Sequence, residues 1–530
     1  MIEKVKKSYD DYKKLYIIAI VSGIFIYSTM IFMNLYNTYD AVWIYNILNR
    51  EAGTWERAAG RFLWPYIDRF RMGIVLNTFN SIISIALYEL GNILIIDLFG
   101  IRRKLSRLTL IIAITASPVI SASLTYVFMS PTFAFAYLFS VLAAYFFIKN
   151  ENRIIEVIGG SVLLALSMGC YQAYIGVCMF LILLFIVLKL FYDEKCSDLI
   201  RDIVSTAVMV VCTGVIYYIS VHVVLAVYGE SLGTYKGADS ISPLGMIIGL
   251  PASIRQSYQY FINCFLTNAP FVNQFHLFKI QFLAWLVIAG VILVRMIRNV
   301  TACARGGDKA SKTVIRYIIV VLLLLLIPLA CNFVFIIAGD QQNSLIMQGA
   351  TAIVLPTMLA VLFERTEWRN ACRYIVILPA LLLVWANILS VTNDQVTLLS
   401  GRKATLAIAN SIVADLDEYD YDPETMELII VGKPSDNSSY LKSEAYKMAA
   451  DYAKFGDWWS SLPGDHDCWE GFLWSELGID LNYLAADELY YWWVDNVDEV
   501  NKMPIWPSKG STKRIGNILV VRVSEQWYLI

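Results

Sequence analysis

Long apolar runs recur along this chain, and they constrain its fold more than any other feature of the sequence. Runs of about 18 or more apolar residues, each long enough to cross a bilayer as a helix, follow one another through the first 392 residues. Only 16% of the 530 residues are charged, well below the roughly 25% that is usual in soluble domains. The sequence therefore predicts a polytopic α-helical membrane protein.

The basic residues predict how these helices are oriented. Five lysines between residues 4 and 14 precede the first apolar run, so the positive-inside rule places the N-terminus in the cytoplasm. About eleven transmembrane helices put every short basic loop on that side and leave the C-terminus outside. We expect the spans near residues 15–35, 73–99, 108–129 and 133–148, on either side of a polar notch at 167–174, and near 203–228, 278–297, 317–337, 345–363 and 374–392.

The composition changes after residue 392, and we expect two domains: a transmembrane domain over 1–392 and an extracytoplasmic domain over 393–530. The second part holds 11 Lys and Arg against 23 Asp and Glu, a balance that suits the outer face. Strand-like runs at 427–432 and 517–523, with helical spacing near 440–455 and 483–499, predict an α/β fold. Eight of the fourteen tryptophans lie here; sugar stacking, domain core and a membrane-facing belt are open alternatives for them.

Two long external loops follow from this topology, over residues 36–72 and 229–276. The first is the more informative, because it carries four acids, five arginines and many aromatic residues. Long loops in compact proteins are usually functional or disordered, and the aromatic content argues against disorder. We interpret the first loop as helical, lying on the membrane surface and holding a polar reaction site.

Asp40 is the candidate base in this loop. It follows the first span by a few residues and lies next to Tyr39. A carboxylate at the membrane interface can act as a general base on a sugar hydroxyl. A solvated loop acid, or an N-cap for a helix that begins at Ala41, is the structural alternative.

Arg57 and Arg61 are four residues apart and fall on one face of a helix. Two guanidinium groups in this arrangement suit a phosphate, although side chains that extend to lipid phosphates would look the same. Glu51 and Glu56 can pair with these arginines.

Tyr171 and Gln172 lie in the polar notch between two apolar helices. Polar groups at that depth are costly unless they face protein, water or a ligand, so sugar binding and helix-to-helix hydrogen bonding are both open. Asp340 follows another span at its outer end, and His276 precedes one; an interface role is favoured for both.

The nine cysteines show no metal-binding spacing, and most lie in apolar runs. Cys264 and Cys468 fall on the predicted outer side and can pair, although nothing in the sequence requires it. The run Asp-His-Asp-Cys at 465–468 is a weak metal signal. No Walker or GxGxxG motif stands between a strand and a helix, so we expect no nucleotide cofactor. We expect no metal site either, and whether the activity requires a metal ion is left open.

Four features together resemble the GtrII-type bacterial glucosyltransferases: Tyr-Asp at 39–40, Gly-Arg-Phe at 60–62, the notch sequence LSMGCYQA at 166–173, and a C-terminal outer domain. These enzymes modify O-antigen and related surface polysaccharides. They belong to the polytopic GT-C class, which takes polyprenyl-phosphate sugars as donors. In the sequence this likeness extends over the whole architecture, although its motifs are short.

The resemblance implies roles for the loop and notch residues. Asp40 would be the catalytic base, and Arg61 together with Arg57 would hold the donor phosphate. The residues expected in the sugar or acceptor pocket are Tyr39, Glu51, Glu56, Tyr171, Gln172 and Asp340. Some GT-C enzymes carry an adjacent acidic pair where this chain has the single Asp40, which leaves the division of labour with the two glutamates open.

The implied function is membrane glycosyl transfer on the outer face of a bacterial inner membrane. A hexose, glucose in this family, would pass from a polyprenyl-phosphate donor to a surface polysaccharide or lipid-linked glycan, with inversion at the anomeric carbon. The expected partners are the lipid-linked sugar, the glycan acceptor and membrane lipids, and no nucleic acid. A flippase or transporter, or a polymerase, of lipid-linked oligosaccharides is the alternative. Mid-helix positions nearly free of charge favour chemistry at one face over passage across the membrane.

Overall fold

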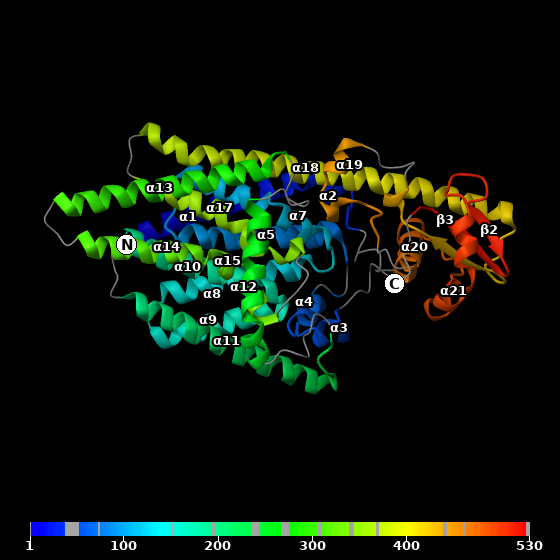
Figure 1. The fold of residues 1–530 in the computed structure, drawn as a ribbon, viewed down its shortest axis with the longest axis horizontal. Coiled ribbons are helices and arrows are strands. Elements are labelled where there is room, and N and C mark those ends of the chain that lie inside the picture. Colours follow the sequence, from blue (N-terminus) through cyan, green and yellow to red (C-terminus); the bar gives the residue numbers. More distant parts are fainter. Residues whose placement is uncertain are drawn as a thin grey trace.

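A bundle of membrane-length helices makes up most of the molecule, and a small region with strands lies beyond one end of it (Figure 1). The computed structural model describes residues 2–37, 52–70, 72, 75–150, 152–192, 198–234, 243–266, 275–305, 310–338, 344–366, 370–437, 443–458 and 462–525. Within these residues eight helices are long and apolar enough to cross a membrane, or nine when the bent pair α6 (Lys104–Thr115) and α7 (Pro118–Thr125) counts as one span. The expected polytopic helical architecture is confirmed, and the number of eleven spans stays a prediction.

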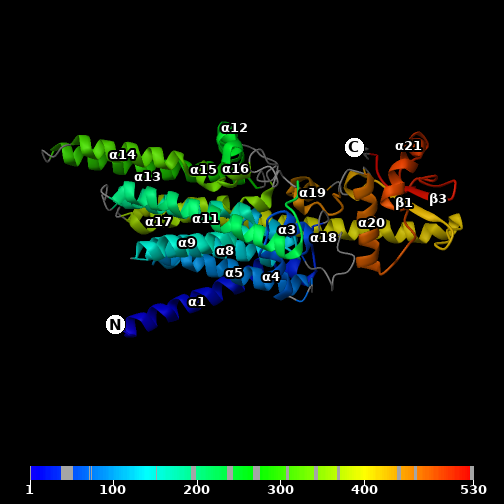
Figure 2. The ribbon, with the colours of Figure 1, turned by 90° about the horizontal axis from the view of Figure 1, so that it is seen from below.

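Helices occupy the stretches in which the sequence predicts spans. The first predicted span lies in two helices, because the chain turns at Tyr27 between α1 and α2. The remaining helices of the bundle are packed side by side, as Figure 2 shows from a second direction. Their bounds are α1 (Ile2–Ile26), α2 (Ser28–Phe32), α5 (Asn77–Leu98), α8 (Ser130–Lys149), α9 (Arg153–Cys170), α10 (Ile175–Tyr192), α11 (Leu199–Tyr228), α13 (Leu277–Arg305), α14 (Ala310–Leu325), α15 (Ile327–Cys331), α16 (Val334–Ala338), α17 (Gly349–Arg365) and α18 (Asn370–Asp415).

Two breaks in the bundle have clear local causes. Pro118 begins α7 because its ring fixes φ and it has no N–H to donate, and the Ser117 side chain caps the helix by accepting from the Ile120 N–H. The two halves meet at 45°. The polar notch produces the second break: α9 ends at Cys170, Tyr171 is extended, and the short helix η1 (Gln172–Tyr174) leads into α10. The predicted division at 167–174 is confirmed.

The predicted second external loop contains a helix of its own. This helix, α12 (Pro243–Phe265), runs across the direction of the bundle helices in Figure 1. It packs on α15 and α16, and the Asn332 side chain donates to the Ser257 carbonyl over 3.0 Å. This arrangement holds the crossing helix against the bundle.

Helix α18 is the feature that the sequence analysis placed least well. We expected a span to end at residue 392 and a new domain to begin at 393, but the helix continues to Asp415 and is 46 residues long, about 69 Å. Its extension is held by hydrogen bonds to the first helices: Gln395 donates to the Ile26 carbonyl over 2.8 Å and accepts from the Met30 N–H over 3.0 Å. The boundary proposed at 392/393 therefore falls inside one continuous helix.

The region after α18, which we call the tail, contains a three-stranded sheet with the order β1-β3-β2. Strands β1 (Glu427–Val431) and β3 (Ile518–Arg522) are parallel, with Glu427 opposite Ile518, and both predicted strands are confirmed. The antiparallel β2 (Thr512–Ile515) was not predicted. Helices α19 (Glu444–Met448), α20 (Leu462–Leu477) and α21 (Ala486–Lys502) complete the tail. Its standing as a separate extracytoplasmic domain stays a prediction.

The tryptophans of the tail that the structure describes are mainly core. Trp458, Trp469 and Trp493 are fully buried, whereas Trp474 is 44% exposed. Cys264 and Cys468 are both buried, and neither forms a disulfide, so the pairing that we considered is not made. Where the chain is described, no group of three or more His, Cys, Asp or Glu side chains is placed to hold a metal ion.

Candidate active site

The end of the bundle nearest the tail carries the residues of the first external loop. Helices α3 (Thr54–Ala58) and α4 (Trp64–Phe70) lie there in both views (Figures 1 and 2). The turn between them contains Gly60 and Arg61. Gly60 has φ +77°, and a Cβ atom at this position would come within 2.5 Å of the Tyr217 hydroxyl. Both observations require glycine, because other residues rarely adopt this φ and none would fit.

The notch residue Gln172 fastens this turn to the helices. Its side-chain amide donates to the Ala59 carbonyl over 2.7 Å and to the Tyr217 hydroxyl over 3.0 Å. Tyr217 in turn donates to the Gly60 carbonyl over 3.0 Å. Gln172 therefore makes hydrogen bonds to other segments of the same chain, which we considered as the alternative to sugar binding. Its place in a sugar pocket stays a prediction.

Arg61 is the central charged residue of the turn and is 7% exposed. Its guanidinium carbon lies 5.0 Å from the ring centre of Tyr171, 5.1 Å from Trp55 and 5.2 Å from Trp64. We call these three rings the Arg61 cage. Each ring presents its π-system to the cation at a distance typical of cation–π attraction. The structure thus brings Arg61 next to Tyr171 and Gln172, as the sequence analysis expected.

Arg57 has a different environment from Arg61. Its Nε and one terminal nitrogen lie 2.7 and 2.5 Å from the two carboxylate oxygens of Glu230, a bidentate pair. The guanidinium also lies 4.1 Å from the centre of the Tyr228 ring. The hydrogen bonds to Glu230 raise the pKa of Arg57, and the same contact lowers the pKa of Glu230. The sequence analysis did not foresee this partner. A phosphate would have to reach Arg57 through the terminal nitrogen that does not contact Glu230, or replace Glu230.

Two buried acids, Glu56 of α3 and Asp68 of α4, hold the backbone around the start of α3. Glu56 accepts from the Gly53 N–H over 2.6 Å, and Asp68 accepts from the Ala52 N–H over 2.8 Å. Both carboxylates are buried. Together with the hydrogen bonds of Gln172 and Tyr217, these bonds fix the part of the first loop that begins at Ala52. We call this set of hydrogen bonds the rear anchor of the loop.

A second set of contacts fixes the chain just before residue 38. The Tyr36 hydroxyl donates to Glu476 of α20, and Arg402 of α18 pairs with the other oxygen of that carboxylate at 2.5 Å. Arg402 also donates to the carbonyls of Met33 and Asn34 over 2.7 and 3.2 Å, which satisfies groups left over where α2 ends. We call Tyr36, Arg402 and Glu476 the front anchor.

Four predicted site residues lie outside the described residues. Tyr39, Asp40 and Glu51 belong to the stretch 38–51 between the two anchors, and Asp340 belongs to 339–343. Their predicted roles stay predictions. The front anchor and Glu230 were missed by sequence reasoning, because both depend on contacts between segments that are distant in the chain. Trp55 and Trp64 lie within six residues of Arg61, but the sequence analysis treated them only as part of the aromatic content of the loop.

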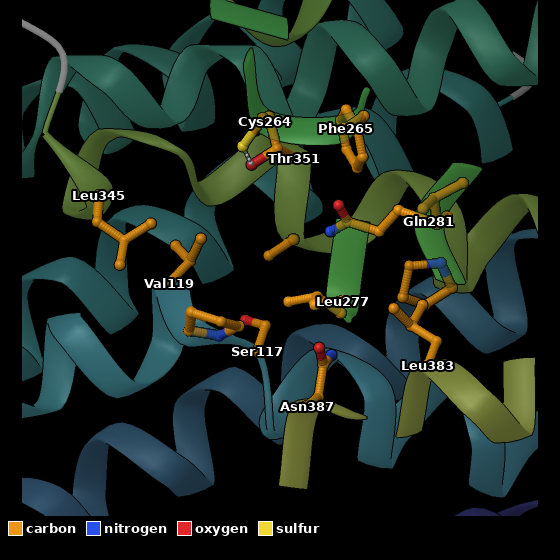
Figure 3. A pocket seen from close by; sticks show the side chains of 14 residues that line it. Ser117, Val119, Cys264, Phe265, Leu277, Gln281, Leu345, Thr351, Leu383 and Asn387 are labelled. Atoms are coloured by element: carbon orange, nitrogen blue, oxygen red, sulfur yellow. Dashed lines mark hydrogen bonds between the residues drawn. The ribbon is translucent and has the colours of Figure 1, made fainter. Parts of the chain in front are cut away.

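A small cavity lies elsewhere in the bundle, at the bend between α6 and α7. Figure 3 shows the amides of Gln281 and Asn387 pointing into it from different helices. Its volume is about 40 Å³, room for one or two water molecules. It is too small for a sugar, so it does not compete with the Arg61 cage as a candidate site.

Comparison with protein families decides the identity of the chain at the level of the family. The model of the family described as Glucosyl transferase GtrII matches residues 29–363. The chain belongs to this family. Membership in the GtrII family supports a glycosyltransferase and suggests that the sugar is glucose. No curated protein and no solved structure matches the chain.

The GtrII match includes the first loop, the Arg61 cage, the notch and Glu230, and it ends within α17. It does not extend to α18 or the tail. The likeness that the sequence analysis extended over the whole architecture is therefore shown only for residues 29–363. The rear anchor lies wholly within the matched part, whereas two of the three residues of the front anchor lie beyond it.

Proposed function

We propose that the protein transfers a hexose, glucose on the evidence of its family, from a polyprenyl-phosphate donor to a hydroxyl of a surface polysaccharide or lipid-linked glycan. The reaction takes place at the end of the bundle that carries the Arg61 cage, on the outer face of a bacterial inner membrane. The observation that supports this most is the burial of the Arg61 guanidinium among Trp55, Trp64 and Tyr171.

Arg61 is the proposed ligand of the donor phosphate. A guanidinium presents a planar set of N–H groups that matches phosphate oxygens, and a cation in a site walled by protein stabilises the charge that develops on the leaving group. Aromatic walls also suit a sugar, since Trp and Tyr combine a large apolar face with a polar edge. Arg57 is the second candidate, and it contributes through the terminal nitrogen that does not contact Glu230, or when phosphate replaces Glu230.

Asp40 is the proposed general base. The acceptor oxygen attacks the anomeric carbon while Asp40 takes its proton, and the bond from that carbon to the phosphate oxygen breaks. A single displacement of this kind inverts the anomeric centre. The anchors on both sides of 38–51 support the assignment, because they fix the two points between which this stretch must run.

Sugar transfer from a synthetic polyprenyl-phosphate-glucose by the purified protein tests the proposal. Asp40→Asn should lower the rate by roughly 10²–10⁴-fold, the contribution of a general base, and Arg61→Lys by roughly 10²–10³-fold. Arg69→Lys is the matched control, since this exposed arginine lies over Tyr66 and outside the cage. Wild-type behaviour of Asp40→Asn would refute the base, and a purified protein that moves no sugar would favour a transporter instead.

A further inference from the structure

The opposite end of the bundle contains a larger cavity. Helix α9 ends beside Arg61 and begins at Arg153, 18 residues away, so its two ends are about 27 Å apart. This length is close to the ~30 Å of a bilayer core. A cavity of about 320 Å³ lies at the Arg153 end, between the ends of α8 and α10 and the starts of α9 and α11. It therefore lies near the membrane interface opposite to the candidate active site.

The lining of this cavity is part apolar and part charged. Its apolar wall is formed by Phe147, Ile148, Ile182, Phe185 and Ile186, and its polar wall by Asn150, Arg153, Glu156, Lys189, Arg201 and Asp202. The volume is at the lower end of the ~300–1,000 Å³ of small-molecule sites. An amphipathic cavity at this level of the membrane fits a molecule with an apolar chain and a charged group.

The cations of the cavity are linked through two aspartates. Lys189 lies 2.6 Å from Asp202 and 3.1 Å from Asp198, and Arg201 lies 3.2 Å from Asp198. Arg153 completes the network at 3.7 Å from Asp202. The Arg201 side chain is still 52% exposed. Since a guanidinium has five N–H donors, Arg201 can hold an anion without leaving its aspartate.

Glu156 is the unexplained member of this group. It lines the cavity and is 9% exposed. Among the residues that the structure describes, its carboxylate makes no hydrogen bond and no ion pair within 4.0 Å. Arg153, Arg201 and Lys189 attract it from a longer distance, and a donor that reached it from the cavity would satisfy its oxygens directly. The cavity beside it is where such a group would come from.

We propose that this cavity binds the headgroup of a zwitterionic ethanolamine phospholipid. The ammonium group donates to Glu156, the phosphate accepts from Arg201, and the acyl chains lie along the apolar wall. The three cations and three acids of the cluster balance, so a headgroup without net charge is favoured over an anionic one. A choline headgroup lacks the N–H donors that Glu156 requires. This site is independent of the proposed transfer reaction.

Lipid-binding measurements on the detergent-purified protein test the site. After removal of native lipid, phosphatidylethanolamine, phosphatidylcholine and phosphatidylglycerol with identical acyl chains are added in turn, and bound lipid is counted by native mass spectrometry. Loss of one charge-assisted hydrogen bond typically weakens binding by roughly tenfold or more. We therefore expect phosphatidylethanolamine to bind about tenfold more tightly than the other two lipids.

Variants separate this site from general lipid binding. Glu156→Gln should abolish the preference for the ethanolamine lipid, and Arg201→Gln should weaken both phosphatidylethanolamine and phosphatidylglycerol. Glu364→Gln is the matched control: this partly buried carboxylate contacts Arg103 and does not line the cavity, so the preference should persist. Equal binding of the three lipids, or a preference for the ethanolamine lipid that survives in Glu156→Gln, would each overturn the proposal. It would also be overturned if inorganic phosphate alone stabilised the protein against unfolding as much as phosphatidylethanolamine does.

Discussion

The two anchors of the first loop are built from different parts of the molecule. The rear anchor uses a short glycine turn and hydrogen bonds to α9–α11, all inside the stretch that the GtrII family model matches. The front anchor uses Arg402 and Glu476, which lie in α18 and the tail and outside that match. The comparison indicates that the family's own residues fix the Arg61 side of the loop. In this chain the tail contributes to holding the other side.

Among changes that leave Asp40 and Arg61 themselves intact, the largest effect is expected from the rear anchor. Gly60→Ala forces a Cβ against the Tyr217 hydroxyl and strains a positive φ, which displaces the Arg61 turn. Since a shift of about 1 Å can cost roughly 100-fold in rate, we expect transfer to fall by about that factor. Gly53→Ala is the matched control, because no atom lies within 4 Å of its Cβ position, and it should stay within about twofold of wild type. A fully active Gly60→Ala variant would contradict the importance of this turn.

A smaller loss is expected from the front anchor. Glu476→Gln removes the carboxylate that Arg402 and Tyr36 share, and this leaves a largely buried guanidinium without its counter-ion. Because Arg61 is untouched, kcat should fall by about tenfold while the KM for the donor stays within about twofold. Glu444→Gln serves as the control in the same region, since its side chain is highly exposed. An unchanged kcat would show that the tail does not position the loop.

The pair between Arg57 and Glu230 should matter least for the rate. The side chains of this pair are 11% and 14% exposed, and the pair lies outside the Arg61 cage. Glu230→Gln keeps an amide oxygen that can still accept from Arg57, so the variant should lower transfer by less than about threefold. Because salt screens partly buried pairs much less than exposed ones, the effect should change little between low and high salt. A loss comparable to that of Arg61→Lys would instead place Arg57 in the donor site. Steady-state transfer rates of the variant and the wild type are compared at about 0.05 and about 0.5 M NaCl, which lie below and above physiological ionic strength.

The smallest effect concerns pH and the front anchor. Burial, together with the neighbouring Glu476, raises the pKa of Tyr36 well above its usual value, which is about 10. The neutral hydroxyl therefore contributes stability that is full below about pH 10. This contribution declines above it, since the unfolded chain ionises first. We expect the difference in Tm between wild type and Tyr36→Phe to narrow by about 1 °C between pH 8 and 10.5. A constant difference would show that the Tyr36 environment is not retained in solution.

The sequence predicted those parts of the molecule that depend on local pattern. Long apolar runs predicted the helices, the polar notch predicted the break at Tyr171, and short apolar runs predicted β1 and β3. The end of α18 was placed wrongly in the interpretation, because a change from apolar to polar composition marks where lipid ends and does not stop a helix. Only contacts such as Gln395 with Ile26 explain why the helix continues.

The sequence predicted that Arg61 and the notch lie close together, but it did not predict their hydrogen-bond and ion-pair partners. Arg61, Tyr171 and Gln172 lie together as expected, but Gln172 binds the Ala59 carbonyl, 113 residues away, and Arg57 binds Glu230, 173 residues away. Such pairings follow from tertiary structure and leave no spacing signal in the chain. The burial of Glu156 is a further example, since its sequence neighbours give it the appearance of an ordinary charge at a helix start.

The unbroken course of α18 has a mechanical consequence. From Pro379, near its membrane end, to Asp415 the helix extends for 36 residues, a lever of about 54 Å. A tilt of roughly 5° at that proline would swing the far end by about 5 Å. Arg402 lies partway along this segment and donates to the carbonyls of Met33 and Asn34, where α2 ends. A change in bilayer thickness that altered the tilt of α18 would thus move the point at which the first loop begins.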